Sequence, residues 1–253
     1  MQLHELTAVI VFYQGRKDLL ECIIALIKEG LEDIVVVNNN TKIKLNVVYP
    51  QVRIVQSSSN IGYGAGVNLG VTFVDRKYVL IMNPDVIVTR GSVRVLIAAL
   101  KRLRVVAVGP RLTNMQGFEI NQVGTKTLTP LLAIKEMSFL AKIFKRDDLG
   151  QKWGEVELIA GACLIVRRDV FLEVGGFDEK FFLYFEENDL CKRIVDHGYK
   201  IYHEPKVIVK HDWEPGKKSL GTSKEIFEQS RFYYFKKHFG LIWALMVEFW
   251  VRF

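Results

Sequence analysis

Residues 7–28 read TAVIVFYQGRKDLLECIIALIK, and this stretch predicts a β-strand followed directly by an α-helix. The run Thr7–Tyr13 is apolar, as in a strand buried on both faces. In Asp18–Lys28 the leucines and isoleucines recur with helical spacing along one face, and Gly30 stands where the helix would end. A strand joined to an amphipathic helix is the repeating unit of parallel α/β sheets.

The same alternation continues along the first part of the chain. Short apolar strands are expected at Asp33–Val37, Val52–Val55 and Tyr78–Met82, and helices at Gly66–Phe73 and Ser92–Arg102. Repeated β-α-β units predict an α/β fold with a largely parallel sheet and helices on both faces. In such folds, ligands bind at the carboxyl ends of the strands.

The pattern becomes less regular after Gly109-Pro110. Helices are expected at Leu131–Phe144, Asp169–Val174 and within Phe181–His197, and strands at Leu158–Val166, Tyr199–Tyr202 and Lys206–Lys210. We therefore divide the chain into a nucleotide-binding half (residues 1–110), an acceptor-binding half (residues 111–238) and a C-terminal helix (residues 239–253). The irregular segment Thr113–Trp153 is expected to line the acceptor side.

The composition is that of a globular protein with a sizeable core: 253 residues, of which 49% are hydrophobic and 25% charged. This length fits one large domain or two tightly fused halves. A net charge of +7 predicts a basic surface that could meet nucleic acid, an acidic membrane or a phosphorylated substrate. Because no nucleic-acid motif is visible, we expect the last two and no nucleic acid.

The three cysteines, Cys22, Cys163 and Cys191, have none of the spacings of a zinc site or a disulfide framework. Each lies in an apolar or helical run, which predicts reduced core thiols in a cytoplasmic protein. The apolar start at Thr7–Tyr13 has no cleavage-site pattern and is interpreted as a strand, not as a signal peptide. No apolar stretch reaches the ~20 residues that span a bilayer.

Polar residues directly follow the strand expected at Tyr78–Met82. Asn83-Pro84-Asp85 places two oxygen-bearing side chains at the ligand-binding edge, around a proline that stiffens the turn. Such hard oxygen donors suit magnesium or manganese, and a diphosphate would complete the coordination shell. Because Asn-Pro-Asp is also good turn chemistry, these residues alone fit a plain turn equally well.

A glycine-rich stretch covers Asn60–Gly70 and reads NIGYGAGVNLG. Glycines let a backbone approach a ligand closely, and the stretch opens a helix whose N-terminal amides favour phosphate. The spacing gives neither GxGxxG nor a phosphate-binding loop ending in Gly-Lys-Ser/Thr, which disfavours nicotinamide dehydrogenases and P-loop enzymes. The structural alternative is a close-packed helix start.

An acidic cluster follows an aromatic run in Phe181–Arg193, which reads FFLYFEENDLCKR. Clustered carboxylates repel each other and apolar neighbours disfavour ionisation, so at least one pKa should be raised, as suits a general base near neutral pH. We expect Asp189 and Arg193 to form an i, i+4 ion pair. The aromatic neighbours indicate that Glu186 and Glu187 are not simple surface residues.

These three elements, in this order, resemble glycosyltransferase family 2, and within it the rhamnosyltransferase-like branch. The resemblance extends from about Thr7 to His238, and no single motif carries it alone. The matching segments are Val35–Thr41, Asn60–Gly70, Asn83–Asp85, Gly161–Arg168, Gly175–Glu179, Phe181–Arg193 and the late His211.

The resemblance implies a GT-A fold and inverting transfer from a nucleotide-sugar donor to a hydroxyl group. Asp85 and His211 would hold Mg²⁺ or Mn²⁺, which neutralises charge on the departing diphosphate. Glu187 would be the general base, with Glu186 as the alternative catalytic carboxylate. The residues implied for binding the donor nucleotide sugar are Asn38, Asn60, Gly62, Gly64, Asn68 and Asn83.

Three residues depart from the family pattern, among them Asn188, a neutral residue where many relatives have an apolar one. Asn38 stands where the family usually has Asp, and its carbonyl can still accept a hydrogen bond from a pyrimidine base. Glu187 replaces the usual Asp and moves its carboxylate by roughly one carbon–carbon bond, a difference that matters in catalysis. The changes at Asn38 and Glu187 keep open the alternative of a non-catalytic protein that binds nucleotide sugars.

The expected donor is dTDP-rhamnose, with a UDP-hexose or UDP-galactofuranose as the alternative. A sugar-phosphate nucleotidyltransferase is disfavoured, because Tyr13–Lys17 carries one glycine where that class has a glycine-rich phosphate loop. The expected acceptor is a glycan or a polyprenyl-linked sugar in cell-surface polysaccharide synthesis, met at the inner face of the cell membrane.

The C-terminal segment 239–253 combines aromatic residues with basic ones. Trp243, Phe249 and Trp250 lie close to Arg252, and Lys236 and Lys237 come just before the segment. This combination is typical of a helix that lies in the membrane interface. A core helix that packs on the acceptor-binding half or on a partner subunit fits the segment equally well.

Overall fold

The computed structural model describes residues 3–120, 126–137, 154–212 and 223–252. Its strands are β1 (Leu6–Phe12), β2 (Ile34–Asn38), β3 (Val52–Gln56), β4 (Tyr78–Met82), β5 (Val86–Ile87), β6 (Ala107–Thr113), β7 (Gly154–Val156), β8 (Cys163–Arg167) and β9 (Ile201–His211). Its helices are α1 (Arg16–Glu29), α2 (Tyr63–Val71), α3 (Ser92–Leu103), α4 (Pro130–Met137), α6 (Arg168–Glu173), α7 (Glu186–Asp196), α8 (Ser223–Phe239) and α9 (Leu241–Arg252).

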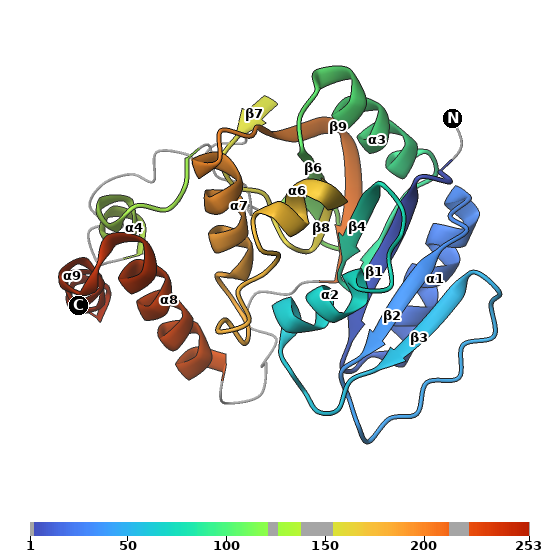
Figure 1. Cartoon of the computed structure of the whole chain (residues 1–253), viewed down its shortest axis with the longest axis horizontal. Coiled ribbons are helices and arrows are strands. Elements are labelled where there is room, and N and C mark those ends of the chain that lie inside the picture. The colour runs from blue at the N-terminus through green and yellow to red at the C-terminus, as the bar shows by residue number, and fades with distance from the viewer. Residues whose placement is uncertain (1–2, 121–125, 138–153, 213–222, 253) are drawn as a thin grey trace.

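One mixed sheet organises the protein, with strand order β3-β2-β1-β4-β8-β6-β9-β5 and β7 beside β9. β1 to β4 are parallel to one another, as the β-α-β pattern predicts, whereas β8 runs antiparallel between β4 and β6. Alternate residues of β1 face opposite sides. Ile10 packs with α1 and α3, and Val9 packs with α2, α6 and α7, so helices cover both faces (Figure 1).

The predicted boundary at Gly109-Pro110 lies inside β6. Pro110 lacks the N–H that a continuous ladder needs, and the register against β9 shifts between Pro110 and Arg111. The strands expected at Tyr199–Tyr202 and Lys206–Lys210 form one strand, β9, whose extra residues are absorbed at the same shift. Strands from both predicted halves therefore share one sheet.

Several predicted elements differ in extent from the structure. The sequence pattern predicts none of β5, β6, β7 and α8, and β8 begins at Cys163 rather than at Leu158. α4 ends at Met137, and the rest of the helix expected at Leu131–Phe144 lies outside the described residues. Most of Thr113–Trp153, the expected acceptor-side segment, also lies outside them.

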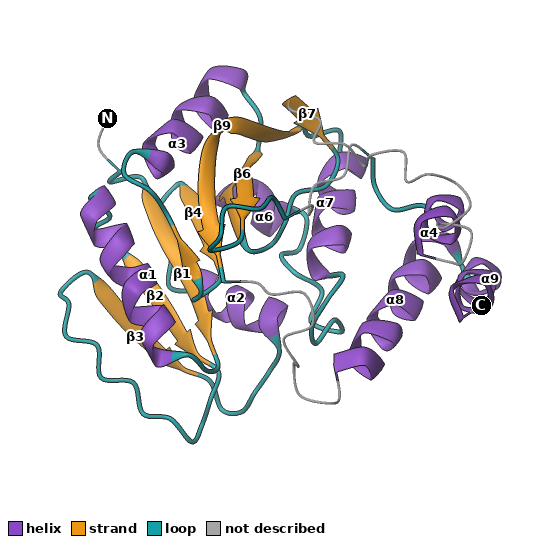
Figure 2. Ribbon diagram, turned by 180° about the vertical axis from the view of Figure 1, so that it is seen from behind, coloured by secondary structure: helices purple, strands orange, loops and turns teal. Residues whose placement is uncertain are grey.

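A second, smaller core joins α4, α8 and α9 to the loop before α7. This group of helices lies beyond α7, away from the parallel strands, in both views (Figures 1 and 2). α8 and α9 are separated by Gly240, whose φ of 90° favours glycine. Among the described helices, none is both long enough and apolar enough to cross a membrane.

Candidate active site

Strand pairing brings three predicted site residues together at the end of β4. The short β5 pairs antiparallel with β9, so that Val86 lies opposite His211. His211 Nε2 lies 3.3 Å from Asp85 Oδ1 and 3.5 Å from the amide nitrogen of Asn83. The backbone fixes this corner, because Asn83 N–H donates to the Ala162 carbonyl and Asp212 N–H to the Asp85 carbonyl.

This corner offers atoms that could bind a metal ion. Asp85 Oδ1 is buried and accepts no hydrogen bond, although buried polar atoms usually have a partner, and the nitrogen that faces it at 3.3 Å is His211 Nε2, not Nδ1. Within the described part of the chain, no three His, Cys, Asp or Glu residues are grouped closely enough to hold a metal alone. A cation here would therefore use these two side chains and oxygen atoms from its ligand.

Two adjoining hollows open in front of the corner and share Val11, Tyr13, Gln14 and Tyr63. The first, of about 400 Å³, is mainly apolar and is further lined by Asn39, Asn60, Gly62, Phe182, Leu183, Ser223 and Ile226. The second, of about 540 Å³, is further lined by Gly15, Asp18, Asn83, Pro84, Asp85 and Asp212. Volumes of this order are typical of small-molecule sites.

The acidic pair begins α7. Glu186 is 4% exposed, and its Oε2 has no hydrogen-bond partner. Burial, together with the charge of Glu187, raises the pKa of Glu186 well above its usual value, and burial also raises the pKa of Glu187. A carboxylate with a raised pKa can accept a proton near neutral pH, which is the property expected of a general base.

Tyr63 connects the acidic pair to the Asp85 corner. It lines both hollows, and its hydroxyl donates to the Gly161 carbonyl at 2.9 Å. Burial raises the pKa of Tyr63 well above its usual value, and the charges of Glu186, Glu187 and Asp85 raise it further. Glu186 and Glu187 themselves line neither hollow, but Glu187 and Tyr63 lie beside the same glycine: a Cβ on Gly161 would be 3.4 Å from Glu187 Cβ and 3.9 Å from Tyr63 Cε1. Tyr63 stands inside the glycine-rich stretch but was not predicted as a site residue.

Three of the predicted donor-binding residues line the hollows: Asn60, Gly62 and Asn83. Asn38 does not. It is fully buried, and its amide nitrogen donates to the Ile43 carbonyl and to Gln56 Oε1, both at 2.7 Å. Its own carbonyl accepts from the Asn40 N–H, so the side chain orders the loop after β2.

Asn39 lines the first hollow instead of Asn38. Its amide nitrogen donates to the Gly62 carbonyl at 2.8 Å and to Asn60 Oδ1 at 3.1 Å. Asn39 thus ties the end of β2 to the start of α2. Successive side chains of an extended chain point to opposite sides, which is the signal that could have separated Asn39 from Asn38.

Gly64 and Asn68 act in packing. A Cβ on Gly64 would lie 2.9 Å from Phe177 Cβ, and one on Gly70 would lie 2.5 Å from Val9 Cγ1. Asn68 donates to the Phe177 carbonyl at 2.8 Å and accepts from the Phe177 N–H at 2.9 Å. This part of the glycine-rich stretch is the close-packed helix start that the sequence left as the alternative.

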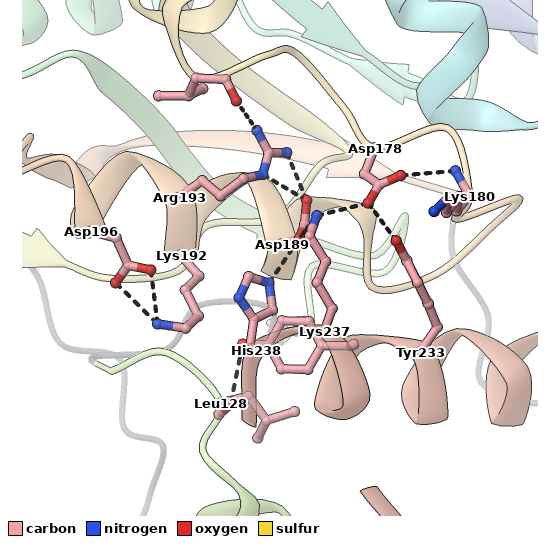
Figure 3. A network of polar contacts seen from close by, with 12 residues as sticks. Leu128, Asp178, Lys180, Asp189, Lys192, Arg193, Asp196, Tyr233, Lys237 and His238 are labelled. Atoms are coloured by element: carbon pink, nitrogen blue, oxygen red, sulfur yellow. Dashed lines mark hydrogen bonds and ion pairs between the residues drawn. The ribbon is translucent and has the colours of Figure 1, made fainter. Parts of the chain in front are cut away.

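Asp189 belongs to an ion-pair network, shown in Figure 3. Its carboxylate contacts Arg193 Nε at 2.8 Å, Lys237 Nζ at 2.6 Å and His238 Nε2 at 2.8 Å. Burial alone would raise the pKa of Asp189, but hydrogen bonds and charges from His238, Arg193 and Lys237 lower it to about 2. The expected Asp189–Arg193 pair is confirmed, and Asp189 stays ionised.

The fold matches that of solved glycosyltransferases. The crystal structure of GalNAc-T7 with UDP, GalNAc and Mn²⁺ superposes with a TM-score of 0.62, covering 91% of this chain and 47% of that one at 16% identity. The predicted GT-A fold is therefore confirmed. The sequence profile of Glycosyl transferase family 2 matches residues 7–175, and the chain belongs to that family.

Curated relatives include the low-salt glycan biosynthesis hexosyltransferase Agl10 of Haloferax volcanii, 26% identical over 76% of this chain. Another is the N-acetylglucosaminyl-diphospho-decaprenol L-rhamnosyltransferase of Mycobacterium tuberculosis, 30% identical over 64% of this chain. This chain covers 62% and 59% of their respective lengths, so it spans about three fifths of each relative.

Proposed function

We propose that the protein is an inverting glycosyltransferase that moves one sugar from a nucleoside diphosphate to a hydroxyl group. The observation that carries the proposal is the place of Tyr63: it lines the second hollow together with Asp85, and it lies beside Gly161 together with Glu187, since a Cβ on Gly161 would be 3.9 Å from Tyr63 Cε1 and 3.4 Å from Glu187 Cβ. Asp85 and His211 can bind a cation, and that cation can neutralise charge on a diphosphate. The acidic pair can take a proton from a nucleophile. Membership of family 2 supports the same chemistry.

Asp85 and His211 are the proposed ligands of a divalent ion, Mg²⁺ or Mn²⁺, with Asn83 beside them. Hard oxygen donors suit these ions, and Asp85 Oδ1, which accepts no hydrogen bond, is available to bind one beside His211 Nε2. An ion bound there would neutralise charge on the departing diphosphate. GalNAc-T7 was crystallised with Mn²⁺ and UDP, which supports manganese as the first ion to test.

Glu187 is the proposed general base, with Glu186 as the alternative. The acceptor hydroxyl would give its proton to the carboxylate while its oxygen bonds to the anomeric carbon and the bond from that carbon to the diphosphate breaks. This single displacement inverts the anomeric centre and conserves atoms and charge. In this scheme, the charge of Glu187 adds to burial in keeping the pKa of Glu186 high.

The proposed donor is dTDP-rhamnose, and a UDP-hexose or UDP-galactofuranose is the alternative. The Mycobacterium tuberculosis relative is named as an L-rhamnosyltransferase, which supports the first, and GalNAc-T7 binds UDP, which supports the second. In either case residues 1–110 would bind the donor and residues 111–238 the acceptor. Asn60, Gly62 and Asn83 are the donor contacts that line the hollows.

The proposed acceptor is a glycan or polyprenyl-linked sugar at the inner face of the cell membrane. The Mycobacterium tuberculosis relative is named for a diphospho-decaprenol acceptor, which supports a lipid-linked one. α9 buries Ala244 and Val247 against its neighbours and exposes an apolar stripe: Leu241, Ile242, Leu245, Met246 and Phe249. Such a stripe near basic Lys236 and Arg252 suits a lipid interface.

The donor and the ion can be tested together by thermal shift with a panel of nucleotide sugars, each with and without Mn²⁺. A ligand that binds only the folded protein raises its melting temperature. We expect dTDP-rhamnose with Mn²⁺ to give the largest rise and to be the donor consumed in a transfer assay with a polyprenyl-linked acceptor. No shift and no transfer with any nucleotide sugar would overturn the proposed function.

A further inference from the structure

The chain turns in a strained conformation immediately before the acidic pair. Tyr184 and Phe185 have φ angles of 71° and 68°, and Phe185 is the residue that caps α7. Bulky side chains rarely adopt this left-handed region, and they keep it only where their surroundings hold them. Elsewhere in the described ranges, Arg104 is the one other non-glycine residue with a positive φ.

One face of α8 holds this turn. The Ser230 hydroxyl donates to the Leu183 carbonyl at 2.8 Å, directly before the strained pair. The ring of Phe227 lies 5.5 Å from that of Tyr184 and 5.3 Å from that of Phe185. Tyr234 lies 5.6 Å from Phe185. The three α8 residues are spaced i, i+3 and i+7, so they share one side of the helix.

The start of α2 holds the other side of the same loop. Tyr63 N–H donates to the Phe182 carbonyl at 3.0 Å, and a Cβ on Gly62 would lie 2.6 Å from that oxygen. The loop therefore runs between the wall of the first hollow and α8. Its backbone contacts both, through carbonyls one residue apart, at Phe182 and Leu183.

The same helix also holds the first turn of α7. The Phe185 carbonyl accepts the Asp189 N–H at 2.9 Å, and the buried Asp189 carboxylate meets Lys237 and His238 of α8 (Figure 3). α8 thus fixes the chain before Glu186 and one turn after it. Glu186 and Glu187 lie between these two attachments.

We propose that Ser230 is a positioning residue, whose bond to the Leu183 carbonyl, with the rings of Phe227 and Tyr234, holds the strained turn that sets the position of the Glu186–Glu187 pair at the start of α7. This inference rests on the proposed function, because it assigns the pair a reaction to perform. In the proposed function the acidic pair takes a proton from the acceptor and does not hold the nucleotide sugar. A displacement of its carboxylate by a fraction of an ångström should therefore lower turnover and leave donor affinity unchanged.

The test compares Ser230→Ala with the wild type in a transfer assay over a range of pH. We expect kcat to fall roughly 10- to 100-fold, with the donor KM unchanged and the acid limb of the pH profile displaced. Ser230→Thr keeps a hydroxyl at this position, and its kcat and pH profile should be close to those of the wild type. A melting temperature close to that of the wild type shows that Ser230→Ala remains folded.

Tyr233→Phe is the matched control, because it also removes one hydroxyl from α8. That hydroxyl donates to Asp178 at 2.9 Å, so its removal leaves the Ser230 bond to the Leu183 carbonyl in place. The Tyr233→Phe substitution should leave kcat and the pH profile at wild-type values. A Ser230→Ala enzyme with the kcat and pH profile of the wild type would overturn the inference.

A readout without turnover separates this inference from the proposed function. Burial raises the pKa of Glu186, and at a pH below that pKa its protonated carboxyl would give an infrared band whose frequency reports its surroundings. We expect the band to shift in Ser230→Ala and to stay in place in Tyr233→Phe. If the wild type transfers no sugar, the proposed function fails, while an unshifted band in Ser230→Ala would overturn the positioning role independently.

Discussion

His211 Nε2 lies 3.3 Å from a carboxylate oxygen of Asp85, although the two residues stand on opposite sides of the predicted boundary at residue 110. The pairing of β5 with β9 makes this contact, and the turn between β4 and β5 supplies the carboxylate. The proposed cation site would therefore depend on backbone pairing as much as on the two side chains.

Removing the carboxylate should abolish both transfer and its dependence on a divalent ion. We expect Asp85→Ala to lower kcat/KM by about three orders of magnitude, since a bound cation contributes several kcal/mol to transition-state stabilisation and each 1.36 kcal/mol is tenfold in rate. The measurement is a titration of activity with Mn²⁺. Asp75→Ala, at an exposed carboxylate outside both hollows, is the control and should respond to Mn²⁺ like the wild type.

The two members of the acidic pair should respond differently to amide substitution. We expect Glu187→Gln to lower kcat by roughly 10²- to 10⁴-fold, the usual contribution of a general base, while donor binding measured by calorimetry is retained. Glu186→Gln should act more weakly on kcat. A more severe effect at Glu186 would transfer the base assignment to that residue.

The buried acidic pair should also make stability depend on pH. Burial raises the pKa of Glu186 in the folded state, so between the unfolded and folded pKa values the native state binds more protons. The free energy of unfolding therefore falls as pH rises through this interval. Glu186→Gln removes that charge and should raise the melting temperature by about 2–4 °C at pH 8, with little change at pH 4. Equal shifts at both pH values would contradict this account.

The Asp189 network should stabilise the contact between α7 and α8. Because the pKa of Asp189 is lowered to about 2, its contribution is present above the unfolded value and is lost as pH falls toward 2. We expect Asp189→Asn to cost about 3–5 kcal/mol in denaturant unfolding at neutral pH, as for other broken buried ion pairs. Asp196→Asn, which breaks only the exposed pair with Lys192, should cost less than about 1 kcal/mol.

The closest packing of α2 on the sheet should be sensitive to a single methyl group. Gly70→Ala would place a Cβ 2.5 Å from Val9 Cγ1 and 3.0 Å from Val37 Cγ2, so we expect a loss of about 1–3 kcal/mol. Val9→Ala removes the nearest methyl groups. The double variant should therefore be more stable than the sum of the single changes predicts, and strict additivity would contradict the proposed clash.

Local pattern predicted the parallel half of the fold well. Tyr78–Met82 is the strand expected there, and Gly30 ends α1 in a left-handed conformation. Both were predictable because a short apolar run and a glycine at a helix end act through neighbouring residues. Long-range pairing was not predictable in the same way. No local signal indicates that β8 would enter beside β4, or that a proline could stand within β6 at a register shift.

The residues of the candidate site also fall into those that local sequence predicts and those that depend on long-range contacts. Residues next to a strand end, such as Asn83 and Asp85, could be predicted from position alone. The choice between Asn38 and Asn39 depended on which way each side chain points, and the loop after β2 decides that through the hydrogen bonds of Asn38. The left-handed turn at Tyr184 and Phe185 has no local sequence signal, since it is maintained by contacts with distant α8.

The insertion of β8 between β4 and β6 has a practical consequence for anyone dividing the gene. A fragment ending at residue 110 would keep β4 but lose its antiparallel neighbour, leaving the apolar edge Tyr78–Met82 without a partner. Unpaired apolar edges of this kind recruit other chains, so such a fragment would precipitate or form inclusion bodies rather than fold as a separable nucleotide-binding module. Chimeras between relatives should therefore be designed by exchanging surface loops, so that all strands of the sheet come from one parent.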